Sequence, residues 1–249
     1  MRVKLQPAFV LHSRPYRDSS QILDVLTAEH GRLSVVAKGS RRRRRGGHTG
    51  AILQPFLPLL LSFTGRAEMR TLTAVETAGR ARTPPGPRLF SAFYLNELLV
   101  RLLHKHDPHP VLFLAYGDAL SELCDAHGMD EVLRRFELTL LRELGFGFDL
   151  AVDGDSGEVL EADKWYRFDA QYGLVWEREV SVERSAYLGL DLLAMAAGSL
   201  GGPVKQTAKR LLRRALAEQL GDKPLKSREL FRAHATESSS FDVAGESSC

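Results

Sequence analysis

The sequence has little cysteine: Cys124 and Cys249 are the two thiols among its 249 residues. Cys124 lies within an apolar helical pattern, far along the chain from Cys249. Two thiols cannot build a disulfide framework or a four-thiolate zinc site within one chain. We therefore expect a protein of the reducing cytoplasm and no metal cofactor held by thiolates.

Long hydrophobic runs are also missing. Apolar runs such as Leu57–Leu61, which is interrupted by Pro58, are far too short to cross a bilayer. The first residues, Met1–His12, have no long apolar stretch followed by small residues. Neither secretion nor membrane insertion is expected.

Motifs that carry catalysis are absent as well. The sequence has no G-x-x-x-x-G-K-[ST], no G-x-G-x-x-G between a strand and a helix, and no G-x-S-x-G. The histidines between His104 and His109 resemble a metal cluster but fall in a predicted interhelical loop. Asp153, Asp155 and Glu158 resemble the start of a calcium loop, yet Lys164 stands where the closing glutamate belongs. We predict no catalytic residues and no cofactor. A metal-dependent nucleic-acid-processing enzyme or an RNA-binding module remains the alternative.

Positive charge, by contrast, is concentrated near the start of the chain. Residues 1–80 hold 14 Lys or Arg against 5 Asp or Glu, whereas residues 81–249 hold 20 against 26. Five consecutive arginines, Arg41–Arg45, follow a β-like run that ends at Lys38. Unpaired guanidinium groups are too costly to bury, so this cluster faces solvent or an anionic partner. Nucleic acid is the predicted partner.

The candidate phosphate contacts fall into two ranks. The first rank is Arg32, Lys38, Arg41, Arg42, Arg43, Arg44 and Arg45, and the second is Arg14, Arg17, Arg66 and Arg70. Aromatic side chains could stack on bases, although a small barrel more often uses them in its core; these are Phe9, Tyr16, Phe56 and Phe63.

Strand-like segments with turn signals between them fill the first 80 residues. They are Ala8–Leu11, Gln21–Leu26, Leu33–Ala37, Leu53–Phe63 and Arg66–Val75. Five short strands in this length predict a small barrel of the OB-fold type, which commonly binds single strands of nucleic acid.

A proline-rich linker at residues 81–87 divides the chain, because Pro84, Pro85 and Pro87 can continue neither a helix nor a central strand. Helical periodicity then predicts three helices, the third ending at Gly145, and a further helix after Pro203. The predicted fold is α+β and multidomain: a barrel over 1–80, then a mostly α-helical domain over 88–235 with a hairpin insertion at 150–180. Residues 236–249 are predicted to be a disordered tail.

Eight short motifs resemble the RecO family of bacterial recombination mediators. They are Ala8–Tyr16, His30–Arg32, Val36–Gly39, Leu53–Leu60, Tyr94–Leu98, Leu133–Leu138, Leu144–Gly147 and Lys223–Phe231. Each motif is weak alone, but their order along the chain is that of the family. The resemblance implies an OB-fold followed by a helical domain.

The resemblance also implies partners. They are single- and double-stranded DNA, which the family binds and anneals, the C-terminal tail of the single-stranded DNA-binding protein, RecR and, indirectly, the RecA recombinase. Some members carry a four-cysteine zinc site after the Leu144–Gly147 motif, whereas residues 148–180 have no cysteine here. A site for an acidic, hydrophobic-ended tail needs a cation beside an apolar pocket. Arg134 is the predicted cation, with Lys205 and Lys209 as helpers if their helices pack together.

Overall fold

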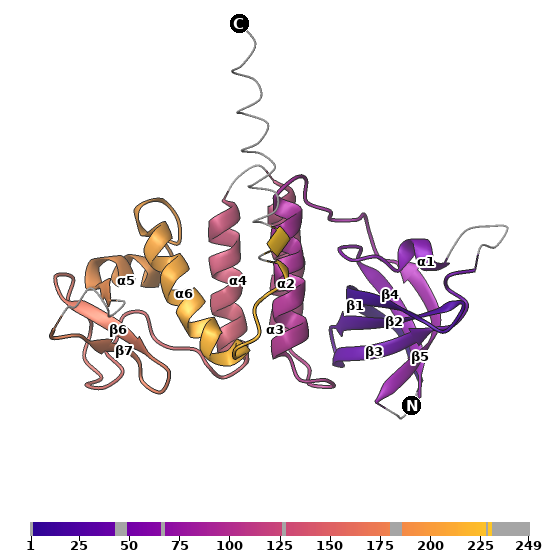
Figure 1. Cartoon of the computed structure of the whole chain (residues 1–249), viewed down its shortest axis with the longest axis horizontal. Coiled ribbons are helices and arrows are strands. Elements are labelled where there is room, and N and C mark those ends of the chain that lie inside the picture. Colours follow the sequence, from indigo (N-terminus) through magenta and orange to yellow (C-terminus); the bar gives the residue numbers. More distant parts are fainter. Residues whose placement is uncertain are drawn as a thin grey trace, which may run out of the picture. The chain divides into compact units, whose positions relative to one another are not determined.

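The computed structural model describes residues 2–42, 49–65, 68–125, 128–179, 186–227 and 229–230. The chain forms two compact units. The first consists of Met1–Ala126 with Pro224–Cys249, and the second of His127–Lys223. Figure 1 colours the elements by their place in the sequence, from indigo at the N-terminus to yellow at the C-terminus.

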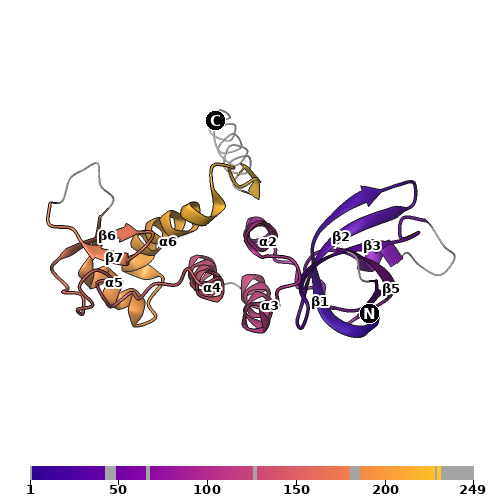
Figure 2. The ribbon, with the colours of Figure 1, turned by 90° about the horizontal axis from the view of Figure 1, so that it is seen from below.

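The first unit contains a closed five-stranded barrel, which confirms the predicted barrel (Figure 2). Its strands are β1 (Arg2–Tyr16), β2 (Ser20–Thr27), β3 (Gly31–Ala37), β4 (Leu59–Thr64) and β5 (Met69–Thr77). They are ordered β1-β2-β3-β5-β4, and all neighbours are antiparallel except β3 and β5. The inward positions are apolar, with Val10, Leu23, Val35 and Leu61 fully buried.

The predicted strand at Leu53–Phe63 is wrong in its first half. A short helix, α1 (Thr49–Ile52), precedes an irregular segment, and β4 begins only at Leu59. Pro55 and Pro58 lack the N–H group that a strand ladder needs, and Phe56 has a positive φ of 68°. Regular strand pairing is therefore possible only after Pro58, where β4 begins.

Two predicted helices pack against the outer face of β1 and belong to the barrel's compact unit. They are α2 (Arg88–Leu102) and α3 (Pro110–Cys124). The ring of Phe9 on β1 contacts Phe113 and Tyr116, with centroids 5.4 and 5.1 Å apart. The amide of Asn96 donates to the Leu11 carbonyl at 2.9 Å and accepts from the Tyr116 hydroxyl. The compact unit thus continues beyond the proline-rich segment at 81–87.

Removing the buried Asn96 amide should destabilise this contact strongly. Burial raises the pKa of Tyr116 above its ordinary value, so the phenol stays a neutral donor to Asn96. We expect Asn96→Ala to lower the free energy of unfolding by roughly 2–3 kcal/mol, because the Leu11 carbonyl and the Tyr116 hydroxyl each lose a buried hydrogen bond. Urea titration followed by circular dichroism measures this. Tyr116→Phe should cost less, and the double variant less than the sum; additive losses would contradict the shared network.

The second unit packs a small sheet against helices. It contains α4 (Met129–Glu143), β6 (Trp165–Asp169), β7 (Gly173–Trp176), β8 (Ala186–Leu188), α5 (Gly189–Ala196) and α6 (Lys205–Leu220), with a 3-10 turn at Gly202–Val204. The sheet order is β7-β6-β8. The predicted hairpin is confirmed as β6 and β7, whereas β8 and α5 were not predicted. Their apolar residues, such as Tyr187 and Leu192, join one core with Tyr166 and Leu211.

The end of α4 follows the prediction closely. Gly145 adopts a positive φ of 80°, and the Phe146 N–H donates to the Leu141 carbonyl at 2.8 Å. This is the Schellman arrangement, which favours glycine at the left-handed position. Together with the barrel, the helices confirm the predicted α+β fold class.

Candidate nucleic-acid interface

The loop that carries the arginine run is closed at its base by hydrogen bonds of Ser40. Ser40 is buried, and its hydroxyl donates to the Ala37 carbonyl at 2.9 Å. On the other side of the loop, the Gly50 N–H donates to the Ser40 carbonyl at 3.1 Å. The run therefore starts directly after a residue fixed to the barrel. Arg43, Arg44 and Arg45 lie outside the described residues.

The turn between β1 and β2, which carries Arg17 and Asp18, meets this loop. The Arg41 N–H donates to the carbonyl of Ser19, in the turn between β1 and β2, at 3.0 Å. Arg17 lies in the same turn, with its guanidinium carbon 5.1 Å from the centroid of the Tyr16 ring. Arg14 and Lys38 lie at the same end of the barrel, because Pro15 is paired with Gln21 and Gln21 with Ala37.

These exposed cations form a surface that we call the cationic patch. Its members are Arg14, Arg17, Lys38, Arg41 and Arg42, all of them exposed. Residues predicted separately from two segments of sequence thus come together in space. A cluster of this kind attracts a polyanion because each phosphate that it neutralises releases a counterion.

A groove of about 300 Å³ lies beside Lys38. It is lined by Ala37, Lys38, Ser40 and β5 residues Leu72 to Val75. It exists because β3 and β5 pair only between Ser34–Val36 and Met69–Thr71, after which the strands separate. The cationic patch therefore borders a hollow rather than a flat sheet.

Arg32 was predicted as a first-rank phosphate contact, but its side chain is mostly shielded from solvent. Only 14% of its side chain is exposed, and its Nε donates to the Leu103 carbonyl at 3.1 Å. The His106 N–H donates back to the Arg32 carbonyl at 3.0 Å. Gly31 allows this close approach, since a Cβ there would lie 2.0 Å from the Asp107 carbonyl oxygen. Arg32 joins the loop after α2 to the barrel instead of facing solvent.

Arg70, a second-rank candidate, also lies outside the cationic patch. Arg70 is half-buried and donates from Nη1 to the Gly65 carbonyl in the turn before β5. Arg66 lies outside the described residues. Neither adds a described contact to the cationic patch.

The four aromatic candidates for base stacking also differ in exposure to solvent. Phe9, Phe56 and Phe63 are buried, and the Phe56 ring lies 5.0 Å from that of Phe93. Tyr16 is half-exposed beside Arg17. It is the one of the four aromatic candidates that lies at the surface next to the cationic patch.

The candidate partner residues lie in the second unit, where α4 and α6 pack together. Arg134 is 5% exposed, and its Nη2 lies 2.8 Å from Oε1 of the fully buried Glu137. Its Nε and Nη1 have no hydrogen-bond partner among the described residues. Lys205 pairs with Asp130 on α4 at 2.8 Å, and Lys209 is half-buried. Sequence periodicity did not anticipate that the Arg134 guanidinium would be buried beside a carboxylate.

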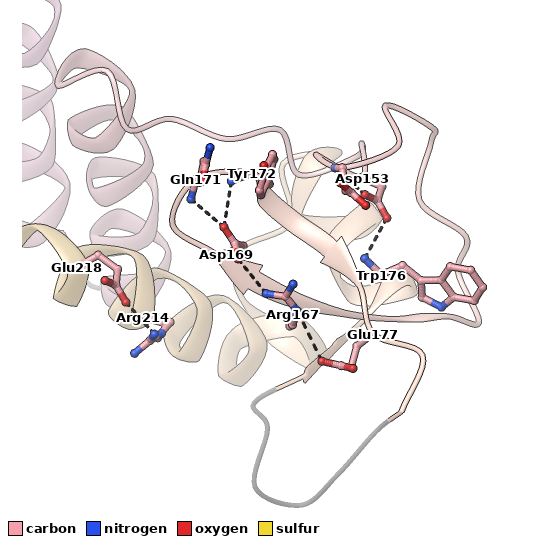
Figure 3. Close-up of polar contacts among 10 residues, drawn as sticks. Asp153, Arg167, Asp169, Gln171, Tyr172, Trp176, Glu177, Arg214 and Glu218 are labelled. Carbon is pink, nitrogen blue, oxygen red and sulfur yellow. Dashed lines mark hydrogen bonds and ion pairs between the residues drawn. The ribbon is translucent and has the colours of Figure 1, made fainter.

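Residues 153–158, which resemble the start of a calcium loop, form a structured turn (Figure 3). Asp153 is buried; its Oδ1 accepts from the N–H groups of Asp155 and Ser156 at 2.9 and 3.2 Å. Its Oδ2 accepts from the Trp176 N–H at 2.9 Å, which fixes the turn to β7. Asp169 closes the next turn, and hydrogen bonds from the Gln171 N–H and Arg167 lower its pKa. Within the described ranges, no group of three His, Cys, Asp or Glu is placed to hold a metal ion.

Replacing Asp153 with alanine should destabilise the second unit by roughly 2–4 kcal/mol, because three backbone N–H groups lose a charged acceptor. Asp155→Ala is the matched control, since that side chain is exposed and its backbone N–H is the donor. Thermal unfolding monitored by tryptophan fluorescence reports on the second unit, which carries both tryptophans of the chain, Trp165 and Trp176. Equal midpoints for the two variants would contradict this role of Asp153.

Comparison with known proteins places these features in a family. The family model described as recombination protein O N-terminal matches residues 1–80, and the one described as recombination protein O C-terminal matches residues 86–229. The chain belongs to the RecO family. The barrel that carries the cationic patch is its N-terminal OB-fold, and the helical region follows it.

Several curated RecO proteins are similar over most of their length. The DNA repair protein RecO of Nitrosococcus oceani is 47% identical over 92% of this chain and 93% of the relative. Those of Methylococcus capsulatus and Photobacterium profundum are 43% and 44% identical, over 93% and 91% of this chain and 94% and 95% of the relatives. RecO membership gives the chain a role in DNA repair and recombination. None of the described helices is both long and apolar enough to cross a membrane.

Proposed function

We propose that this RecO protein binds single-stranded DNA through the cationic patch and anneals complementary strands without catalysing a covalent step. The observation that carries the proposal is the hydrogen bond from Arg41 to Ser19, which joins the start of the arginine run to the turn that carries the exposed Arg17 at one end of the barrel. Arg43, Arg44 and Arg45 continue the sequence from this point.

The mechanism is electrostatic. Two DNA strands repel each other through their phosphates, and a surface that neutralises both lowers the barrier to pairing. Guanidinium groups can hold phosphates while leaving the base edges free to pair. The half-exposed Tyr16 ring beside Arg17 offers a surface on which a base can stack.

The proposed partners follow the family. They are single- and double-stranded DNA, the acidic tail of the single-stranded DNA-binding protein, RecR, and through them the RecA recombinase. Arg134, with Lys205 and Lys209, is the proposed receptor for that tail on α4 and α6. The proposed site of action is the bacterial cytoplasm, at the nucleoid.

An annealing assay tests the proposal. Two complementary labelled oligonucleotides are mixed with the protein, with and without Mg²⁺ or Mn²⁺, and resolved on native and denaturing gels. Annealing that needs no divalent ion, with both strands intact, supports a mediator. Metal-dependent strand scission would instead favour the nucleic-acid-processing enzyme, and the absence of any DNA binding at low salt would refute the proposal.

A further inference from the structure

The last part of the sequence differs in charge from the barrel. Residues 233–249 contain Glu237, Asp242 and Glu246 and no Lys or Arg, while the match to the RecO C-terminal model ends at residue 229. This acidic segment is therefore not part of what defines the family. It lies outside the described residues, and its chemistry comes from the sequence alone.

The chain just before the acidic segment is fastened to the barrel's own unit. The Glu97 carboxylate on α2 accepts from the N–H groups of Lys226 and Ser227, both at 2.8 Å, and from the Ser227 hydroxyl at 2.7 Å. Arg101 donates to the Pro224 carbonyl at 3.2 Å, and Leu225 is buried. Residues 224–227 thus return the chain from the second unit to α2.

This fastening holds at neutral pH. Burial disfavours ionisation of Glu97, but the hydrogen bonds from Ser227 and Lys226 outweigh it and lower the pKa. The carboxylate is therefore ionised and accepts all three donors. Residues 224–227, which precede the acidic segment, are thus fixed to the unit that carries the cationic patch.

The positive charge of the cationic patch is not neutralised by carboxylates of the described residues. Among the described residues, none of its five cations forms an ion pair with a carboxylate, whereas Lys105, Lys164 and Lys205 pair with Glu68, Glu161 and Asp130. Beside the patch lies the groove between β3 and β5, where β5 after Thr71 is paired with β4 on one side but has no described strand along its β3-facing edge. An extended acidic peptide fits both features, because it brings carboxylates to Lys38 and backbone groups to an open strand edge.

The acidic segment is long enough to reach across its own unit. Fully extended, residues 233–249 span up to roughly 55 Å, more than the diameter of a compact unit of this size, whose radius of gyration is roughly 14 Å. Tethering gives such a segment a millimolar effective concentration, so weak contacts suffice for substantial occupancy.

We propose that the acidic segment, residues 233–249, binds the cationic patch and the adjoining groove of its own barrel and competes there with single-stranded DNA. The proposal rests on the proposed function, since it concerns the same DNA-binding surface. This competition makes DNA binding selective for length. Short or weakly held strands are excluded, while long strands that contact many cations displace the segment.

Neutralising the segment in the full chain tests the competition. The variant E237Q/D242N/E246Q should bind a labelled oligothymidine about three- to tenfold more tightly than the parent at ~50 mM salt, as expected from three exposed charge pairs. Its slope of log K against log[salt] should be steeper by up to ~2, because cations freed from carboxylates become available to phosphates. Both differences should vanish near ~1 M salt, where screening is strong.

A matched control separates competition from a general change of charge. The variant D155N/E158Q/D163N neutralises three exposed carboxylates of the second unit and gives the same net charge. It should bind the oligothymidine within about twofold of the parent. Equal affinities of the parent and the segment variant, or an equal gain in the control, would overturn the proposal.

A direct binding measurement makes the proposal independent of DNA. A fluorescent peptide of residues 233–249 is titrated with the full-length E237Q/D242N/E246Q protein, alone and with Lys38, Arg41 and Arg42 replaced by serine. Saturable binding that is lost with those cations supports the proposal. No binding, or binding indifferent to the cations, refutes it. Failure of the proposed function would show differently, as no DNA binding by any variant.

Discussion

Replacing Arg41–Arg45 with serine is expected to weaken single-stranded DNA binding and flatten its salt dependence. If all five arginines meet phosphates, the slope of log K against log[salt] falls by up to ~3.5, since each phosphate contact to a single strand contributes about 0.7. Folding should change little, because exposed charges contribute little to stability. Fluorescence anisotropy at several salt concentrations gives the slope, and circular dichroism checks the fold.

A smaller pair of variants sharpens this result. Arg41→Ser with Arg42→Ser removes two cations of the described patch and should lower the slope by about 1.4. Lys4→Ser with Arg80→Ser removes two exposed cations elsewhere in the same unit and leaves the net charge equal. If both pairs changed the slope alike, the protein would be responding to net charge, and the cationic patch would not be the binding surface.

Arg134→Glu is expected to lower the free energy of unfolding by roughly 3–5 kcal/mol. The substitution removes the partner of the buried Glu137 and adds a second carboxylate at a site that is almost closed to solvent. Arg135→Glu, one residue further along α4 and exposed, should cost less than about 1 kcal/mol. Urea unfolding of both variants measures the difference, and similar midpoints would contradict the buried ion pair.

The same burial changes how the proposed partner site is tested. Arg134→Glu changes both the charge and the stability of the second unit, so Arg134→Lys is the better probe. It keeps the charge beside Glu137 but cannot hold a carboxylate through two parallel N–H groups. If Arg134 receives the acidic tail, this variant binds a labelled tail peptide more weakly while binding bare DNA as the parent does. A parallel loss of DNA binding would contradict separate surfaces.

Local patterns were sufficient to predict most secondary structure. Strand-like segments bounded by turn signals predicted β2 and β3, the 3.6-residue period predicted α2, α3 and α4, and Gly145 marked the end of α4. These features depend on neighbours within a few positions along the chain, because side-chain periodicity and turn chemistry act locally. The prediction failed where proline interrupted a β pattern, at Leu53–Pro58, and for the short elements β8 and α5.

The sequence by itself determined the fold class, the family and the excess of positive charge in the first 80 residues. Tertiary structure decided which cations remain available. Arg32 and Arg134 have the same chemistry as Arg41, but a contact with Leu103 keeps most of the Arg32 side chain from solvent, and a contact with Glu137 holds Arg134 in a buried position. The meeting of Arg41 with Ser19 likewise depends on strand pairing between segments about twenty residues apart. Availability is a property of long-range packing, and periodicity along the chain carries no information about it.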